Sequence, residues 1–367
     1  MQANQRFYGF EEDFRDPFSR DRDRVIHCSS FRRLEYKTQV FLNHEGDYFR
    51  TRLTHSLEVS QVARTMSRML HLNETLAEVI ALSHDLGHTP FGHVGGDELD
   101  KQLKLDGNVL GFEHNFQSFR VLTKLEKRYK DFDGLNLTFA TLEGVLKHSY
   151  PYEKPFLKGL DLEFHLDKHP SLEAMVVDHA DEIAYTSHDI DDGIKYGLIT
   201  FDDLLQDTLC LRVDEMVQKE GVKRDEKLYR HRFVAGLIKI LVEDFIAHSK
   251  EGAKKYQKEM PISSTLDANL KLPLGFSKEM ARELKTLKKL LFLKLYKHEK
   301  IARKMHAGKQ CIKGLYGAFR EDTDLLPPAQ KELFLVRKEQ RVISDYIASM
   351  TDRYAMKTYH EIYGLSL

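Results

Sequence analysis

The stretch LEVSQVARTMSRMLHLNETLAEVIALSHDLG, residues 57–87, decides the fold class of this chain. Its first half carries apolar side chains at steps of three and four, the spacing of one face of an α-helix (Val59, Val62, Ala63, Met66, Met69 and Leu70). Asn73 is a residue type that caps helices and Gly87 is one that ends them, so a next helix is expected from Asn73 to about Leu86. The stretch therefore predicts two consecutive helices.

The rest of the chain continues the helical pattern. Ser171 follows Pro170 and can cap a third helix that runs from Leu172 to about Ile190. Apolar spacing predicts further helices in three C-terminal segments (231–248, 277–306 and 328–348). Strand-like alternation is rare and short, with Thr38–Leu42 as one candidate. We therefore expect an all-α fold with a mostly helical C-terminal region.

No linker rich in proline, glycine or serine marks a clear domain boundary. The character of the sequence shifts near residue 221, so we expect a catalytic region over 1–220 and a helical region over 221–367, or one continuous domain. Between Lys278 and Lys313 there are twelve Lys and Arg against three Glu. A solvated helix face is the first interpretation of this segment. The alternative is an anion-binding patch for nucleic acid, a regulatory nucleotide or a partner subunit.

The overall composition, with 41% hydrophobic and 31% charged residues and a net charge of -1, is ordinary for a soluble globular protein. With this balance the protein has no overall positive charge that would attract nucleic acid or an anionic membrane. The three cysteines form no CxxC pair, which argues against a disulfide framework or a thiolate zinc site. No apolar run approaches the roughly 20 residues that span a bilayer. We expect a cytoplasmic protein with no membrane partner.

Two histidines and two aspartates are the candidate metal ligands (His55, His84, Asp85 and Asp181). Each lies within or beside a predicted helix rich in small or apolar residues. Burying the adjacent His84-Asp85 pair without partners costs several kcal/mol, roughly, and a metal ion removes that cost. The mixed nitrogen and oxygen set suits Mn, Fe, Co, Ni, Zn or Mg. Four protein ligands around an octahedral ion leave two positions for water and a substrate oxygen, which supports hydrolysis.

The predicted helix from Leu172 carries an acidic stripe on an otherwise apolar circumference (Asp178, Asp181, Tyr185, Asp189 and Asp192). A solvent-facing stripe on an amphipathic helix is the alternative to a functional role. A bare His-Asp dipeptide is common and therefore weak evidence. The ordered set of a histidine, a His-Asp pair and an aspartate on three helices is much stronger evidence for a metal site.

Several blocks together resemble the HD superfamily, and within it the dGTPase-like deoxynucleoside triphosphate (dNTP) triphosphohydrolases. They include GDYFRTRLTHSLEVSQVAR (46–64), HDLGHTPFGHVG (84–95), GFEHNFQS (111–118), DHADEIAYTSHDIDDG (178–193) and, near the C-terminus, DYIASMTDRYA (345–355). Residues 200–340 carry little that matches. The resemblance implies an HD-domain helical fold. It also implies hydrolysis of dGTP, and of other dNTPs as further candidates, to deoxynucleoside and inorganic triphosphate by a metal-activated water that attacks the α-phosphorus.

The resemblance also implies roles for individual residues. The four candidate ligands would hold a catalytic divalent metal ion, with Mn or Mg expected first and Fe, Co, Ni or Zn as alternatives. His93 would be the general acid/base that protonates the departing 5′-oxygen, while His88 and His114 would bind or orient phosphate. Relatives carry an acidic residue three positions after the histidine that corresponds to His93, where this chain has Gly96. We expect the neighbouring Asp97 to replace it.

Six further residues are expected to bind the substrate. Arg52 lies one helical turn before His55 and can reach the same phosphate, and Lys147 is a weaker phosphate candidate. By resemblance, Tyr185 packs where a 2′-OH would sit, and Asp189 accepts a hydrogen bond from the 3′-OH. Two residues correspond to positions that meet the base edge, with a β-strand face as the alternative (Gln39 and Val40).

Two other functions remain open from the sequence. One is another HD phosphohydrolase, such as a nucleotidase or a phosphodiesterase, which would share the metal ligands. The other is a non-catalytic sensor of dNTPs or nucleic acid, which the basic segment 278–313 favours. Relatives assemble into oligomers, and some respond to a second nucleotide or to single-stranded DNA. We therefore expect a homo-oligomer, with single-stranded DNA or a regulatory dNTP as candidate partners.

Overall fold

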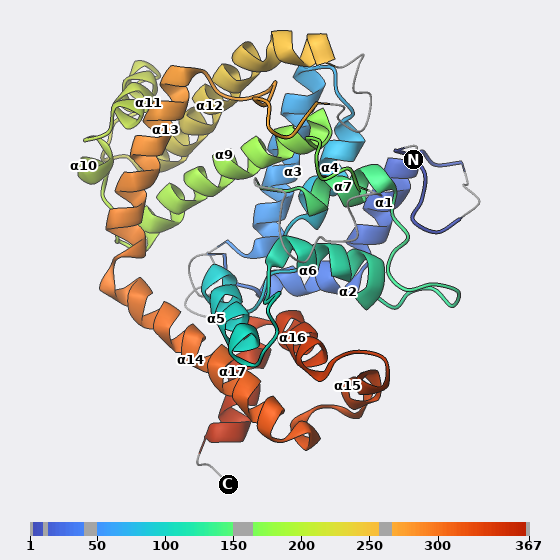
Figure 1. Ribbon diagram of the computed structural model, residues 1–367. Helices are drawn as coiled ribbons and strands as arrows, with labels where there is room; N and C mark the ends of the chain where they lie inside the picture. Colours follow the sequence, from blue (N-terminus) through green and yellow to red (C-terminus); the bar gives the residue numbers. More distant parts are fainter. Residues whose placement is uncertain (1–2, 10–13, 40–49, 150–163, 257–265, 365–367) are drawn as a thin grey trace. The chain divides into compact units, whose positions relative to one another are not determined.

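The computed structural model shows a chain that is helical almost throughout (Figure 1). It describes residues 3–9, 14–39, 50–149, 164–256 and 266–364. Within these ranges, the β-bridges are isolated and build no sheet. The all-α fold is therefore confirmed. None of the described helices is both long enough and apolar enough to cross a membrane.

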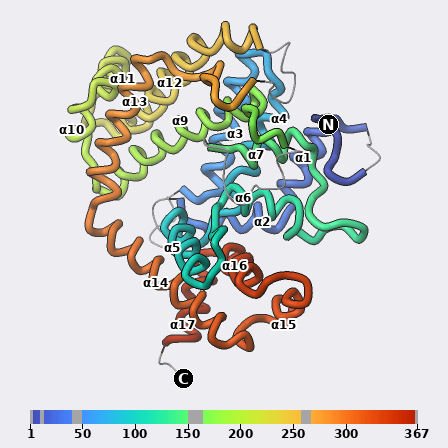
Figure 2. Tube along the Cα trace, in the orientation of Figure 1, coloured from blue at the N-terminus to red at the C-terminus, as the bar shows by residue number. Residues whose placement is uncertain are grey.

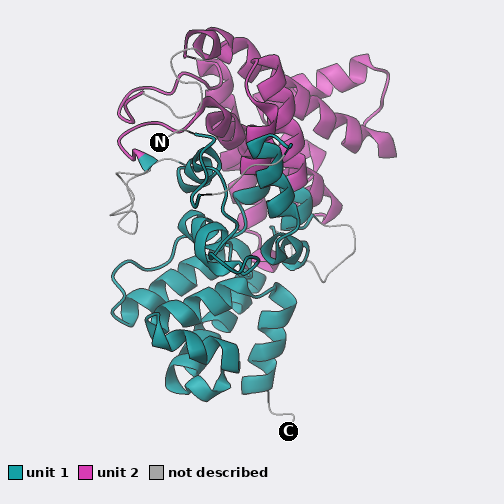
Figure 3. Cartoon of the chain, turned by 90° about the vertical axis from the view of Figure 1, so that its right-hand side faces the viewer, with its two compact units in different colours: residues 1–56, 82–164, 303–367 teal, residues 57–81, 165–302 magenta. Residues whose placement is uncertain are grey.

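The chain divides into two compact units, coloured separately in Figure 3. Unit 1 comprises Met1–Ser56, Leu82–Phe164 and Arg303–Leu367, and unit 2 comprises Leu57–Ala81 and His165–Ala302. Each unit thus collects segments that are far apart in the sequence. Because this division follows no single point in the chain, the functional boundary expected near residue 220 stays a prediction.

Unit 1 contains short helices from both ends of the chain: α1 (Pro17–Ile26), α2 (Ser29–Arg33), α5 (Gly92–Leu105), α6 (His114–Arg120), α7 (Phe139–Leu146), most of α14 (Glu299–Glu321), α15 (Pro328–Lys331), α16 (Glu339–Ser349) and α17 (Asp352–Tyr363). Leu99 and Leu103 of α5 belong to one buried cluster with Phe319 of α14 and Ile343 of α16. Figure 2 shows these segments side by side. The last helices of the chain therefore help to form the core that supports α5.

Unit 2 is built around the long helix α9. Its helices are most of α3 (Arg52–Met69) and of α4 (Glu74–Ser83), together with α9 (Leu172–Lys195), α10 (Phe201–Leu204), α11 (Thr208–Lys219), α12 (Lys227–Tyr256) and α13 (Lys278–Leu291), followed by the π-helical turn η5 (Phe292–Tyr296). Helix α9 packs against α12, and α12 packs against α11. Ser171 caps α9 as predicted, because its Oγ accepts a hydrogen bond from the Ala174 backbone N–H at 3.3 Å.

The predicted helix boundaries hold best where a cap marks them. The helix expected over the apolar stretch 57–72 is present within α3, which ends at Met69, and the one expected at 172–190 is part of α9. The helix expected to reach Leu86 ends at Ser83. The segment 277–306 is not one helix, because the turn η5 separates α13 from α14. The segment 328–348 holds α15, a 3₁₀ turn and α16. Of the expected strand, Thr38 forms an isolated bridge with Thr51, and residues 40–42 lie outside the described part.

Glu173 on α9 is a buried carboxyl group that gives unit 2 a pH-dependent stability. It is 4% exposed, and its Oε1 accepts a hydrogen bond from the Asn73 backbone N–H at 2.9 Å. Burial raises the pKa of Glu173 from 4.5 to about 7, although hydrogen bonds from backbone N–H groups lower it in part. Below pH 4.5 the folded and unfolded states are both protonated. Between pH 4.5 and about 7 the unfolded state releases the proton while the folded state still keeps it, so the folded state loses stability over this range.

We expect Glu173→Gln to raise the free energy of unfolding by up to about 3 kcal/mol at pH 8, but by less than about 1 kcal/mol at pH 5. Glutamine keeps the oxygen that accepts from Asn73. Urea denaturation at the two pH values measures the difference. Glu182→Gln on the same helix is the control, and it is expected to lower the free energy of unfolding rather than raise it. The reason is that His179 and Lys288 lower the pKa of Glu182 despite its burial. An equal gain from Glu173→Gln at both pH values would contradict the prediction.

Candidate active site

The start of α3 and the turn after α4 bring three predicted metal ligands together in unit 1. His55, His84 and Asp85 are 1%, 2% and 3% exposed. One ring nitrogen of His55 and one of His84 lie within 4.8 Å of each other. Two buried imidazoles beside a carboxylate form a donor set that suits a divalent transition metal, so these residues fit the predicted ion. Asp181 belongs to α9 in unit 2, and its part in the ligand set stays a prediction.

Asp85 contacts three basic side chains. Nη1 of Arg52 donates to its Oδ2 at 2.8 Å, while Nε2 of His88 lies 3.0 Å and Nε2 of His84 lies 3.4 Å from its Oδ1. Burial opposes ionisation of this carboxyl group. Arg52, His84 and His88 nevertheless hold the pKa of Asp85 well below its usual value. The group therefore stays ionised and able to bind a cation.

Gly87 allows α6 to approach the turn that carries His84 and Asp85. A Cβ atom at position 87 would lie 2.1 Å from the backbone nitrogen of Ser118, so no larger residue fits there. Oγ of Ser118 accepts a hydrogen bond from the Gly87 N–H at 2.8 Å and donates to the His84 carbonyl at 2.7 Å. These contacts fix the backbone of the turn and with it the direction of the two ligands.

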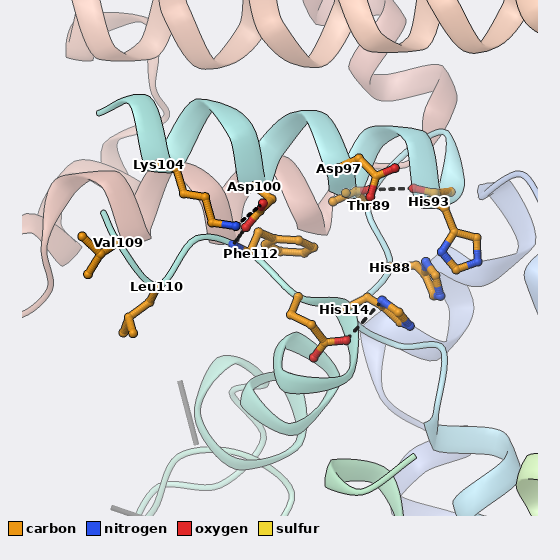
Figure 4. Close-up of a pocket in the computed structure, with 13 residues that line it drawn as sticks. His88, Thr89, His93, Asp97, Asp100, Lys104, Val109, Leu110, Phe112 and His114 are labelled. Carbon is orange, nitrogen blue, oxygen red and sulfur yellow. Dashed lines mark hydrogen bonds and ion pairs between the residues drawn. The ribbon is translucent and has the colours of Figure 1, made fainter. Parts of the chain in front are cut away.

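Three further histidines gather at one end of a pocket of about 430 Å³ in unit 1 (Figure 4). His88 follows the turn, His93 lies in the first turn of α5, and His114 begins α6. One ring nitrogen of each lies within 4.8 Å of the other two. Burial is the main cause that lowers the pKa of His88 well below its usual value, and the charge of Arg52 is the second. The pKa of His114 is lowered in the same way, mainly by burial and then by His93. Both imidazoles are therefore neutral at physiological pH.

Asp97 lines the same pocket, one helical turn after His93 on α5. Its expected help to His93 stays a prediction. Gly96 lines the pocket as well, and a Cβ atom there would meet its nearest neighbours, Phe112 and Thr89, at 3.7 Å. The backbone therefore leaves room for the acidic residue that the resemblance led us to expect at this position.

Two residues next to these clusters were not predicted from the sequence. Glu113 has its Oε1 3.4 Å from Nδ1 of His114 and also caps α6. His148 is 5% exposed, and its ring centroid lies 5.0 Å from that of His84. Glu113 directly precedes His114 in the block GFEHNFQS, and His148 directly follows Lys147. Their places next to two candidate residues are the signal that could have identified them.

The predicted phosphate-binding and base-binding residues differ in the exposure and the hydrogen bonding of their side chains. Arg52 is 2% exposed, and its Nε has no hydrogen-bond partner among the described residues. Lys147 is buried rather than exposed, and its Nζ donates to Oε1 of Glu143 at 2.7 Å. Gln39 is half-buried, and Val40 lies outside the described residues. The substrate roles of all four stay predictions.

Unit 2 brings Tyr185 and Asp189 together with a third residue, Tyr296. The hydroxyl of Tyr296 donates to Oδ2 of Asp189 at 2.7 Å and is hydrogen-bonded to that of Tyr185. Gly193 lies close to the same turn, since a Cβ there would be 2.8 Å from a methyl group of Leu295. The pKa of Tyr296 is raised well above its usual value, mainly by burial and then by the nearby carboxylate of Asp189. No sequence pattern distinguishes Tyr296, which lies in the basic segment interpreted as a solvated helix face.

The C-terminal block DYIASMTDRYA contributes a buried carboxylate that supports the site from within unit 1. Asp352 accepts hydrogen bonds from the backbone N–H groups of Thr38 and Phe91, each at 3.0 Å. Nearby, Nζ of Lys37 donates to the carbonyl of His88 and, at 2.8 Å, to a carbonyl of α16. Burial lowers the pKa of Lys37 to about 7. These bonds connect the last helices with the loops that lead into α3 and α5.

Comparison with known proteins agrees with this fold. The HD domain family matches residues 52–186, which include all four predicted metal ligands, and the phosphohydrolase-associated domain matches residues 274–361. The fold and the site thus define an HD-type phosphohydrolase. The chain is 62% identical to a deoxyguanosinetriphosphate triphosphohydrolase-like protein of Wolinella succinogenes, over 99% of this chain and 100% of the relative.

A second relative of the same description, from Geobacter sulfurreducens, is 44% identical over 96% of this chain and 90% of its own length. The chain therefore belongs to the family of deoxyguanosinetriphosphate triphosphohydrolase-like proteins. This membership confirms the resemblance inferred from the sequence blocks.

Proposed function

We propose that the protein hydrolyses dNTPs, with dGTP as the first candidate, to deoxynucleoside and inorganic triphosphate. The main support for this proposal is that buried, ionised Asp85 contacts both Arg52 and His88. The pocket next to these residues is lined by His93 and His114. This arrangement offers cation-binding and phosphate-binding groups within one unit. The names of the relatives, which describe them as like deoxyguanosinetriphosphate triphosphohydrolases, support the choice of substrate.

In this proposal, His55, His84, Asp85 and Asp181 hold a divalent metal ion, with Mn²⁺ or Mg²⁺ as the first candidates. Such an ion, when bound, supplies Lewis acidity toward a phosphate oxygen and activates the attacking water. The protein's own task is then to place and neutralise the triphosphate, because positioning and charge stabilisation dominate phosphoryl transfer.

Arg52 already donates to Asp85, and its Nε remains available for a phosphate oxygen. The neutral imidazoles of His88 and His114 donate hydrogen bonds to phosphate without requiring a second charge. Attack of water on the α-phosphorus breaks the bond to the 5′-oxygen, and His93 gives that oxygen its proton. His93 is exposed at the pocket and can regain a proton from solvent.

Asp97 is proposed to orient His93 and to keep it basic. We expect Asp97→Ala to lower kcat by about tenfold and to shift the pH–rate profile, with KM little changed. Steady-state rates between pH 6 and pH 9 measure both effects. A variant with the kcat and pH profile of the parent protein would remove Asp97 from the mechanism.

Tyr296 is proposed to hold Tyr185 and Asp189 in the arrangement that favours deoxyribose. We expect Tyr296→Phe to lower the ratio of kcat/KM for dGTP to that for GTP by about tenfold, because one hydrogen bond to a charged group is lost. Tyr316→Phe is the matched control, since the Tyr316 hydroxyl also donates to a carboxylate, Asp106, at 2.8 Å, in unit 1. An unchanged ratio in Tyr296→Phe, or an equal change in both variants, would contradict this role.

The deciding experiment incubates the purified protein with Mn²⁺ or Mg²⁺ and each dNTP or GTP, followed by ion-exchange analysis of the products. Deoxynucleoside with intact triphosphate is the expected result. Monophosphate with pyrophosphate, or stepwise loss of phosphate, would instead indicate another HD phosphohydrolase. No turnover of single dNTPs or of all four mixed would favour the sensor function. Homo-oligomer formation and binding of single-stranded DNA stay predictions for separate measurements.

A further inference from the structure

His88, His93 and His114 have the arrangement of a metal site of their own. They come from three different elements, namely the turn after α4, helix α5 and helix α6. One ring nitrogen of each lies within 4.8 Å of the other two. Figure 4 shows the three rings gathered at the same end of the pocket. Three imidazole nitrogens around one point form a donor set that Zn²⁺ and its neighbours in the first transition row prefer.

Two of the three imidazoles already have a carboxylate partner. Nε2 of His88 lies 3.0 Å from Oδ1 of Asp85, and Nδ1 of His114 lies 3.4 Å from Oε1 of Glu113. A histidine that binds a metal through one ring nitrogen commonly gives its other nitrogen to a carboxylate, which fixes the ring and makes it a better donor. This pattern leaves Nδ1 of His88 and Nε2 of His114 for an ion.

The pocket gives an ion access to the three rings. His93 is exposed and His114 is half-buried, so both can be reached from solvent. Three carboxylates line the pocket (Asp97, Asp100 and Glu113), whereas its lysine, Lys104, is paired with Asp100 at 2.7 Å. The pocket lining therefore carries more acidic than basic side chains, which favours the approach of cations.

We propose that His88, His93 and His114 bind a late first-row divalent ion, with Zn²⁺ preferred, as a second metal site beside the set of His55, His84 and Asp85. Three protein ligands leave at least one coordination position open toward the pocket. A bound ion engages the imidazoles that the proposed function assigns to phosphate binding and proton transfer. Zn²⁺ at this site is therefore expected to inhibit hydrolysis. That consequence rests on the proposed function, whereas the binding of the ion does not.

Co²⁺ is the probe that tells the two sites apart. Four-coordinate Co²⁺ with three nitrogen ligands absorbs strongly in the visible range, whereas six-coordinate Co²⁺ absorbs weakly. The full-length protein is first freed of metal with a chelator and then titrated with Co²⁺, and the bound metal is counted after equilibrium dialysis. We expect two Co²⁺ per parent chain, with a strong visible band from one of them. Excess Zn²⁺ should remove that band.

Single substitutions assign the bound ions to their sites. His93→Ala and His114→Ala are each expected to bind one Co²⁺ fewer and to lose the visible band, whereas His55→Ala should lose one Co²⁺ and keep the band. His306→Ala, at an exposed position on α14, is the control that should bind as the parent does. Circular dichroism checks that each variant is folded, and His93 is exposed enough for its replacement to be tolerated.

A parent protein that binds a single Co²⁺ without a strong band would overturn the second site. An unchanged stoichiometry and spectrum in His93→Ala would do so as well. The proposed function is tested separately by product analysis. A parent protein that hydrolyses dNTPs with Mn²⁺ or Mg²⁺ but never binds a second Co²⁺ would reject only the second site. A chain that binds two Co²⁺ but hydrolyses no nucleotide when it is assayed with Mn²⁺ or Mg²⁺ alone would reject only the proposed function.

Discussion

Replacement of Asp85 by asparagine is expected to lower kcat/KM for dNTP hydrolysis by about 10³-fold and the free energy of unfolding of the metal-free protein by about 3–5 kcal/mol. Asparagine keeps the shape of the side chain but removes its charge. Arg52, which is 2% exposed and donates to Asp85 at 2.8 Å, would then be a buried cation without its counter-charge. The same change removes an anionic ligand from the proposed metal set and the carboxylate that contacts His88.

Steady-state rates with Mn²⁺ and urea denaturation in the presence of a chelator measure the two effects separately. Asp133→Asn is the matched control, because Asp133 pairs with Lys127 where both side chains are about half exposed. That control is expected to change stability by less than about 1 kcal/mol and to leave the rate unchanged. If Asp85→Asn kept the parent's kcat/KM, the assignment of the active site to this cluster would be wrong.

The fold could be predicted from the sequence where one helix carries both a cap and a long apolar face. Ser171 and the apolar residues that follow it specified α9 to within a few residues. The segment 277–306 had the same apolar spacing, yet it is interrupted at η5, where Leu295 is buried and packs close to Gly193. Local apolar spacing does not distinguish this turn from the helices on either side of it.

The site could be predicted where its residues lie in short contiguous blocks. His84, Asp85 and His88 are close in the sequence, and the turn that contains them keeps them close in space. Tyr296 and the contacts of Asp352 could not be predicted in this way. Tyr296 reaches Asp189 through the packing of η5 against α9, and Asp352 reaches Phe91 across 261 residues of chain. Contacts of this kind follow from tertiary structure alone.

The second large effect concerns Asp21 on α1, which holds the N-terminal segment to α7 within unit 1. Its side chain is fully buried, and its Oδ1 accepts from Nη1 of Arg6 at 2.6 Å. Its Oδ2 accepts from the backbone N–H of Thr138 at 2.8 Å, from the Thr138 hydroxyl at 2.7 Å and from that of Thr141 at 2.8 Å. Burial raises the pKa of Asp21 even though Arg6 and Thr138 lower it. Burying this charge is therefore costly, and its four donors offset that cost only together.

We expect Asp21→Ala to lower the free energy of unfolding by about 3–5 kcal/mol. The change leaves buried Arg6 without this counter-charge and removes the carboxylate that accepts hydrogen bonds from Thr138 and Thr141. Asp23→Ala, two positions later on the same helix, is the matched control. Asp23 pairs with Arg15 at 3.1 Å with about a third of each side chain exposed, so its loss should cost less than about 1 kcal/mol. Urea denaturation at neutral pH compares the two variants. Equal losses would mean that water replaces Asp21 around Arg6, and that the N-terminal segment contributes far less to the stability of unit 1 than its buried contacts indicate.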